Sequence, residues 1–196
     1  MDYQAVMDAI YTRGWVIVDD FLTASEVDAL RACLPGEWQP AGIGREGLHQ
    51  GNPEIRRDQI HWLDPSLGAP VADYLARMES LRQSVNQALY LGLHDLEAHL
   101  AVYPPGSFYQ AHLDRFRDSD LRTLTVVLYL NPPDWRDEDG GHLRFWPVDR
   151  EGDSLLLQPA GGTLVTFLSD RFWHAVEPAG RTRLSVTGWF RRRPAL

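Results

Sequence analysis

Three residues with metal-binding side chains stand out in the sequence, and two of them are only two positions apart. His112 and Asp114 flank Leu113, and His174 follows sixty residues after Asp114. In an extended segment, side chains two residues apart point to the same side, so His112 and Asp114 can face one metal ion. Two imidazoles and one carboxylate on one face of an ion leave coordination positions open, which suits a non-haem Fe(II) oxygenase. Zinc accepts the same ligands, so the ligand types alone leave the metal open.

Arg183 follows His174 by nine residues and lies on a predicted strand. In the predicted strand 182–190, alternation places Arg183, Ser185 and Thr187 on one face. If that face looks into the interior, the guanidinium needs a polar partner, because an unpaired buried charge is costly. Arginine binds a carboxylate through two parallel hydrogen bonds. The pattern therefore indicates a dicarboxylate cosubstrate that meets the metal at one end and Arg183 at the other.

A second polar group lies on the strand predicted over residues 122–130. Alternation places Thr125, Val127 and Tyr129 on one face of it. The Tyr129 phenol could contact the same distal carboxylate, or it could pack in the core with its hydroxyl bonded elsewhere. The residue pattern leaves both possibilities open.

Five motifs follow one another in an order that resembles a known family. They are Tyr103-Pro-Pro-Gly-Ser-Phe-Tyr109-Gln-Ala-His112-Leu-Asp114, Leu128-Tyr129-Leu130-Asn131, Gly140-Gly141-His-Leu143-Arg-Phe145, Ser169-Asp170-Arg-Phe-Trp-His174-Ala-Val-Glu177 and Arg183-Leu-Ser-Val-Thr187-Gly-Trp189-Phe190. The series resembles the Fe(II)- and 2-oxoglutarate-dependent dioxygenases of the prolyl 4-hydroxylase superfamily. It is most similar to the Egl-nine-type (hypoxia-inducible-factor) prolyl hydroxylases and their bacterial relatives. The motifs cover roughly residues 100–190, and the segment 56–62 also resembles the bacterial branch.

The resemblance implies a role for each matching residue. The metal ligands for Fe(II) would be His112, Asp114 and His174. The cosubstrate residues would be Arg183 at the far carboxylate of 2-oxoglutarate, with Tyr129 assisting, Tyr103 near the chelating end, and Thr187 and Ser185 beside the cosubstrate. The implied reaction is hydroxylation of a prolyl residue in a protein, coupled to decarboxylation of 2-oxoglutarate to succinate, with O2 as oxidant and ascorbate as a candidate reductant. Two departures from the animal oxygen sensors qualify the match: Tyr103 stands one residue closer to His112, and Ser185 occupies the position two after the arginine, as in many bacterial relatives. The presence of Asp114 argues against the halogenase branch.

A glycine-rich loop over residues 41–54 corresponds, in this resemblance, to a mobile lid over the substrate. Gly42, Gly44 and Gly47 would permit closure, and Arg45 could contact the substrate. The alternative is a surface loop without a role.

The composition restricts the chemistry independently of the motifs. All 19 basic residues are arginine. The absence of lysine excludes Schiff-base catalysis and a P-loop, and it excludes the lysine anchor that collagen-type prolyl hydroxylases use for the distal carboxylate. A net charge of -8 argues against nucleic-acid binding, and no apolar run is long enough to span a membrane. The single cysteine excludes an internal disulfide. We therefore expect a cytoplasmic protein. We also expect it to be a monomer.

The remaining elements must position these side chains. Helices are predicted over residues 2–12, 24–34 (with a capping box of Thr23 and Glu26) and 66–91, and strands over 15–18 and 56–62. After Gly92, strands are predicted over 96–103, 122–130, 142–146, 154–157, 163–168, 172–176 and 182–190. This pattern predicts an α+β, mainly β fold: a double-stranded β-helix (jelly roll, cupin-like) with N-terminal helices bracing one sheet. We expect one domain over 1–196, with helical support and the lid loop in 1–92 and the jelly-roll core in 93–190.

Other functions remain open from the sequence. The same chemistry could act on a free amino acid or small molecule. A non-catalytic, metal-binding cupin-like sensor is disfavoured because it does not need Arg183, and a zinc hydrolase lacks a glutamate base at a recognisable offset from the histidines. For the leading hypothesis, the substrate is a proline-containing protein or peptide, and a translation elongation factor is the first candidate to test.

Overall fold

The computed structural model describes residues 3–42, 54–115 and 121–194. Its helices are α1 (Gln4–Arg13), α2 (Ala24–Ala32) and α3 (Ala69–Leu89). Its strands are β1 (Trp15–Val18), β2 (Gln39–Pro40), β3 (Gln59–Trp62), β4 (Leu93–Tyr103), β5 (Tyr109–His112), β6 (Arg122–Tyr129), β7 (Leu143–Phe145), β8 (Leu155–Leu157), β9 (Leu164–Leu168), β10 (His174–Val176) and β11 (Arg183–Arg192). Single 3₁₀ turns occur at Pro65–Leu67 and Asp137–Asp139.

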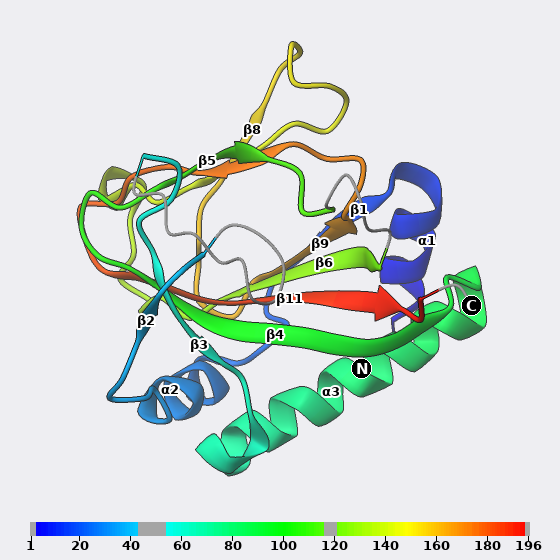
Figure 1. Ribbon diagram of the computed structural model, residues 1–196, viewed down its shortest axis with the longest axis horizontal. Coiled ribbons are helices and arrows are strands. Elements are labelled where there is room, and N and C mark those ends of the chain that lie inside the picture. The colour runs from blue at the N-terminus through cyan, green and yellow to red at the C-terminus, as the bar shows by residue number, and fades with distance from the viewer. Residues whose placement is uncertain (1–2, 43–53, 116–120, 195–196) are drawn as a thin grey trace.

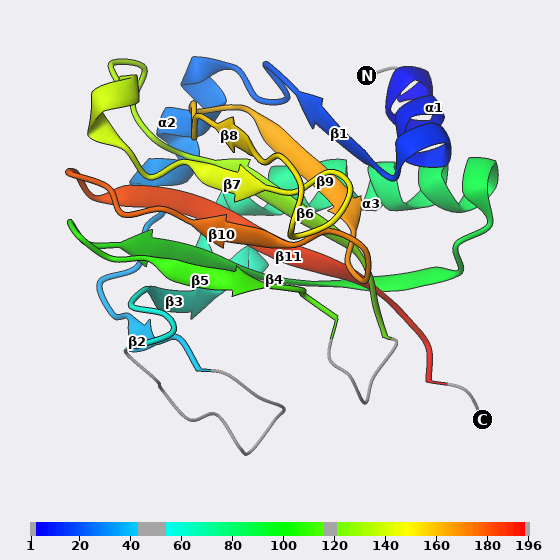
Figure 2. The same cartoon turned by 90° about the horizontal axis from the view of Figure 1, so that it is seen from above.

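The strands form two antiparallel sheets that face each other. The larger sheet has the order β1-β9-β6-β11-β4-β3-β2, and the smaller has the order β5-β10-β7-β8. Figures 1 and 2 show the smaller sheet over one face of the larger, with α3 running along the opposite face. The predicted double-stranded β-helix, with helices bracing one sheet, is confirmed.

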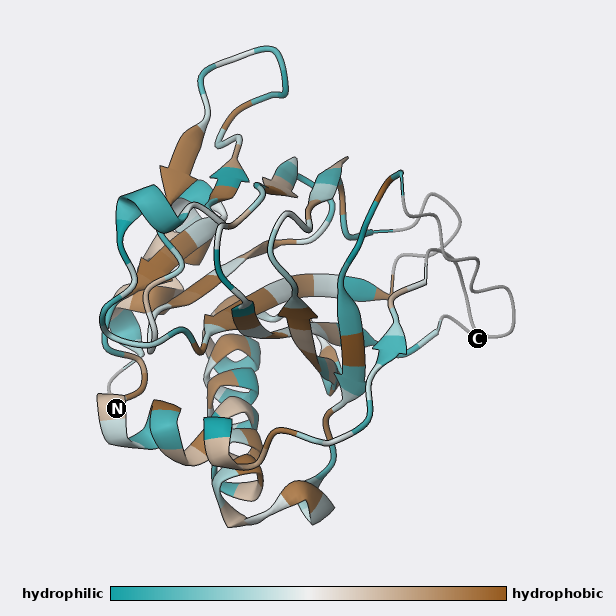
Figure 3. Cartoon of the chain, turned by 90° about the vertical axis from the view of Figure 1, so that its left-hand side faces the viewer, coloured by the Kyte–Doolittle hydropathy of each residue, from teal (hydrophilic) through white to brown (hydrophobic). Residues whose placement is uncertain are grey.

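Alternation along the strands divides the core into two layers. On β11, Leu184 and Val186 pack toward the helices, in a cluster with Met78 of α3. The other layer lies between the sheets and includes Tyr129 and Phe145. In Figure 3, hydrophobic residues concentrate on the strands, whereas the connecting loops are mostly hydrophilic. The face of β11 that begins with Arg183 is therefore turned to the space between the sheets, as the sequence pattern predicts.

The predicted capping box of α2 is also present. The Glu26 amide donates to the Thr23 hydroxyl at 3.3 Å, and the Thr23 amide donates to the Glu26 carboxylate at 2.8 Å. The same carboxylate forms an ion pair with Arg77 of α3. The cap thus begins α2 and also ties it to the helix that braces the large sheet.

Two features differ from the sequence-based expectation. The predicted strands at 15–18 and within 56–62 are present as β1 and β3, but together with the unpredicted β2 they lie at the two edges of the large sheet, so the first 92 residues supply strands as well as helical support. Strand β5 was not predicted, because Tyr109–His112 has little apolar alternation. It forms because it pairs with β10, and that pairing depends on residues more than sixty positions away. Among the described helices, none is long and apolar enough to cross a membrane.

Candidate active site

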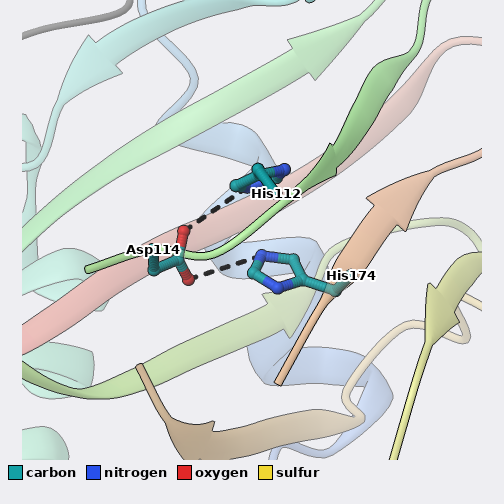
Figure 4. Close-up of side chains that lie close together, drawn as sticks. All are labelled: His112, Asp114 and His174. Carbon is teal, nitrogen blue, oxygen red and sulfur yellow. Dashed lines mark ion pairs between the residues drawn. The ribbon is translucent and has the colours of Figure 1, made fainter. Parts of the chain in front are cut away.

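Strands β5 and β10 bring the three candidate ligands together at one end of the small sheet. His112 and His174 are direct partners across the two strands, and their ring centroids are 4.2 Å apart. Asp114 lies two residues beyond the end of β5. The ligand atoms of the three side chains lie within 4.8 Å of one another, and Figure 4 shows all three pointing toward a common centre.

The hydrogen bonds of the two histidines leave the same ring nitrogen free in each. His112 Nδ1 lies 2.7 Å from the Gln110 carbonyl, and His174 Nδ1 lies 3.1 Å from the Phe172 carbonyl. A carbonyl only accepts, so Nδ1 carries the proton in each ring and the Nε2 lone pair faces the centre. Each Nε2 lies 3.4 Å from an Asp114 oxygen. Two lone pairs and a carboxylate directed at one point repel one another unless a cation lies between them, so this donor set fits a metal ion.

The ionisation of Asp114 agrees with that assignment. The carboxyl is buried, and burial alone would raise its pKa. When they are protonated, His174 and His112 act in the opposite direction and hold the pKa of Asp114 well below its usual range. The residue is therefore ionised at neutral pH, as a metal ligand requires.

A buried arginine lines the same pocket as the three ligands. Arg183 is 1% exposed. Its Nε donates to the Gly141 carbonyl at 2.9 Å, and its Nη1 donates to the Ser185 hydroxyl at 3.3 Å. Within the described residues it forms no ion pair with a carboxylate. A buried guanidinium without an anion is unfavourable, so this position fits the carboxylate of a bound ligand.

Two tyrosines surround the guanidinium on neighbouring strands. In the pairing of β11 with β4, Arg183 lies opposite Tyr103. In the pairing of β11 with β6, Ser185 lies opposite Tyr129. The guanidinium carbon lies 5.0 Å from the Tyr103 ring centroid and 5.2 Å from that of Tyr129. The buried Tyr129 hydroxyl has no hydrogen-bond partner among the residues that the structure describes. Burial raises the pKa of Tyr129 to about 12, although Arg183 opposes the shift, so the phenol keeps a proton to donate.

The other predicted residues divide into three groups. Thr187 and Gly42 line the pocket with the triad. Ser185 and Tyr129 do not line it directly and instead stand around Arg183. Gly44, Arg45 and Gly47 of the predicted lid lie outside the described residues.

A contact beside His112 was not identified from the sequence. Arg56 donates to both carboxylate oxygens of Asp58, at 2.7 and 2.5 Å, and its guanidinium carbon lies 4.3 Å from the centroid of the Tyr109 ring. Tyr109 in turn stacks on His112 with a centroid separation of 3.6 Å. In the sequence, the motif at 56–62 was the only sign of this contact. That it supports the metal ligand His112 becomes visible only from the β3–β4 register and the isolated bridge from Arg56 to Tyr109.

Fold and donor set together define a class, the oxygenases that use Fe(II) and 2-oxoglutarate, and comparison with known proteins agrees. Residues 98–191 match the 2OG-Fe(II) oxygenase superfamily. The crystal structure of a Pseudomonas putida prolyl-4-hydroxylase is 47% identical, with a TM-score of 0.86, covering 98% of this chain and 100% of that one. The chain therefore belongs to the 2OG-Fe(II) oxygenase superfamily, and the expected cofactors Fe(II), 2-oxoglutarate and O2 are those of this superfamily.

Two further relatives extend the similarity beyond bacteria. A Trichoplax adhaerens prolyl hydroxylase, in complex with a hypoxia inducible factor oxygen degradation domain peptide fragment, is 28% identical, with a TM-score of 0.81 and coverage of 95% of this chain and 87% of that one. Human Egl nine homolog 1 is 29% identical, covering 94% of this chain and 45% of that protein. The chain thus spans about half the length of the curated relatives it matches.

Proposed function

We propose that this protein hydroxylates a prolyl residue in a protein or peptide substrate. One O2 oxygen enters a C–H bond of the proline ring, and the other enters succinate as 2-oxoglutarate loses CO2. The observation that carries the proposal is the His112, Asp114 and His174 cluster in one pocket with the buried Arg183. The 47% identity to a bacterial prolyl-4-hydroxylase supports proline as the acceptor.

The proposal assigns a role to each residue of the site. The two Nε2 atoms and the Asp114 carboxylate would hold Fe(II), which when bound supplies the activation of O2. Arg183 would bind the far carboxylate of 2-oxoglutarate, and the unpartnered Tyr129 hydroxyl would donate to the same group. Tyr103 and Thr187 would line the remaining wall of the cosubstrate pocket.

The nature of the substrate follows from the relatives. The Trichoplax enzyme was solved with a peptide fragment, so a proline-containing segment of a protein is the substrate class that we propose here. The protein would act as a monomer in the cytoplasm, and ascorbate would serve as an optional reductant.

Mass spectrometry tests the proposal directly. The protein is incubated with Fe(II), 2-oxoglutarate and O2 and with proline-containing peptides, including peptides from a translation elongation factor. Each peptide has a matched control in which alanine replaces proline, and free proline and a His174→Ala variant are run in parallel. The expected result is the gain of one oxygen atom on the prolyl peptide only, with stoichiometric succinate. Oxidation of free proline instead would refute the peptide substrate, and unchanged activity of His174→Ala would refute the metal site.

A further inference from the structure

A chain of two buried hydroxyl groups ends on the carboxylate of Asp114. Thr125, on β6, lies 2.8 Å from Asp114 Oδ2 through its hydroxyl, and the Ser169 hydroxyl lies 2.9 Å from that of Thr125. Thr125 and Ser169 are both 0% exposed. Neither residue is a metal ligand, and neither lines the pocket.

The donor direction of these two hydrogen bonds follows from the number of protons that the hydroxyl groups can donate. An ionised carboxylate only accepts hydrogen bonds, so the single hydroxyl proton of Thr125 is donated to Asp114. Thr125 can then only accept from Ser169, which must donate. Each bond polarises the next, so the bond that reaches the carboxylate is stronger than an isolated one.

The backbone of Ser169 forms hydrogen bonds to two other segments, one after β5 and one at the start of β6. Its carbonyl accepts from the amide of Arg115, the residue after Asp114, at 3.1 Å, and its own amide donates to the Thr123 carbonyl at 3.1 Å. The end of β5, the start of β6 and the turn after β9 are therefore held together at one point. His174 lies five residues beyond Ser169 on the same connection.

This arrangement makes the two oxygens of Asp114 different. Oδ1 lies 3.4 Å from His112 Nε2, and Oδ2 lies 3.4 Å from His174 Nε2, so distance to the histidines does not distinguish them. Only Oδ2 also accepts from Thr125. We propose that Thr125 and Ser169 are positioning residues, which hold the Asp114 carboxylate in its metal-binding orientation before the ion arrives and leave Oδ1 as the stronger ligand. The inference depends on the metal site of the proposed function, but not on its substrate.

Metal affinity measures this role without reference to turnover. Mn(II) and Co(II) are titrated into the purified, metal-free full-length chain and into its variants. Thr125→Val removes the hydroxyl and keeps the branched shape, and we expect it to weaken binding by roughly 10- to 100-fold, as loss of an outer hydrogen bond to a ligand does. It should also shift the visible spectrum of bound Co(II). Thr125→Ser restores the hydroxyl and should restore both affinity and spectrum.

Two further variants distinguish the effect of the two hydroxyl groups from a general loss of structure. Ser169→Ala should weaken binding less than Thr125→Val, and the double variant should bind metal no worse than Thr125→Val alone, because Ser169 acts through Thr125. The control is Thr166→Val. Thr166 is equally buried and donates at 2.8 Å to the Thr125 carbonyl, not to the carboxylate of Asp114. Its loss should leave metal affinity and the Co(II) spectrum unchanged.

The outcomes distinguish the inference from the proposed function. Wild-type affinity in Thr125→Val, or an equal loss in Thr166→Val, overturns the positioning role and leaves the oxygenase intact. Absence of metal binding by the wild-type chain overturns both. If Thr125→Val does not fold, Ser169→Ala against Thr166→Val decides: equal metal affinity in these two overturns the inference.

Discussion

Replacement of Arg183 by methionine should weaken cosubstrate binding and leave stability nearly unchanged. Methionine fills a comparable volume without the charge. The bound cosubstrate loses its anchor, while the ligand-free protein loses a buried guanidinium that has no carboxylate partner among the described residues. A purely structural arginine would instead lower stability when removed.

The magnitudes follow from the hydrogen bonds. A guanidinium has five N–H groups. Arg183 donates through Nε to Gly141 and through Nη1 to Ser185, which leaves donors at the pocket for a carboxylate. A hydrogen bond to a charged group contributes about 1.5–3 kcal/mol, so two parallel bonds contribute at least about 3 kcal/mol, or roughly 100-fold in affinity. On the stability side, the two lost hydrogen bonds also involve the charged guanidinium and cost about 1.5–3 kcal/mol each, which is comparable to the desolvation penalty of several kcal/mol for a buried ion. These two contributions nearly offset each other, so the free energy of unfolding should change little.

Calorimetric titration of 2-oxoglutarate into Mn(II)-loaded protein measures the first effect, and urea unfolding of the metal-free protein measures the second. Arg191→Met is the matched control on the same strand. Arg191 is bound to Asp95 at 2.9 Å and to Glu97 at 2.7 Å, away from the pocket. Its replacement should leave 2-oxoglutarate affinity unchanged and lower stability by no more than about 1 kcal/mol, because these ion pairs are partly exposed. An Arg183→Met variant that binds 2-oxoglutarate within threefold of wild type, or that is strongly destabilised, would show that the assignment of Arg183 is wrong.

Three further perturbations test the surroundings of the site. Gly141 has φ +70°, and a Cβ there would lie 3.1 Å from Arg183 Cδ, so Gly141→Ala should displace the guanidinium. Loss of about one of its hydrogen bonds to the carboxylate should weaken 2-oxoglutarate binding by about tenfold. Gly180→Ala, which has space and no positive φ, should not weaken it. Asn131 is 1% exposed and bonds one backbone amide and one carbonyl, both at 2.8 Å, so Asn131→Leu should lower the free energy of urea unfolding by about 2–4 kcal/mol. Burial lowers the pKa of His99 to about 3 from 6.5, so the unfolded chain binds a proton that the folded protein does not. Stability should be complete above about pH 6.5 and fall by about 2 kcal/mol by pH 5 in urea unfolding, with a smaller loss in His99→Gln.

These three expectations have clear contrary results. Equal 2-oxoglutarate affinity in both glycine variants would exclude a packing role for Gly141. An Asn131→Leu protein as stable as wild type would mean that the two backbone groups find other partners. A pH profile of His99→Gln that is parallel to wild type would assign the acid sensitivity to other groups.

The sequence by itself determined the features that depend on neighbours along the chain. Apolar periodicity identified the three helices and most strands, and the capping box at Thr23 marked the start of α2. Spacing alone placed His112 beside Asp114 and turned Arg183 to the same face as Thr187. The absence of lysine excluded a lysine anchor for the cosubstrate. All of these are short-range properties of backbone geometry and residue type.

Only the tertiary structure decided how distant segments meet. Strand β5 is too polar to be recognised, and it exists because it pairs with β10, which also brings His112 opposite His174. The hydroxyl chain from Ser169 through Thr125 to Asp114 joins three segments whose order in the sequence gives no sign of contact. Hydrogen bonds of this kind depend on the register of strands far apart in the chain, and register is set by the packing of the whole sheet, which no local pattern contains.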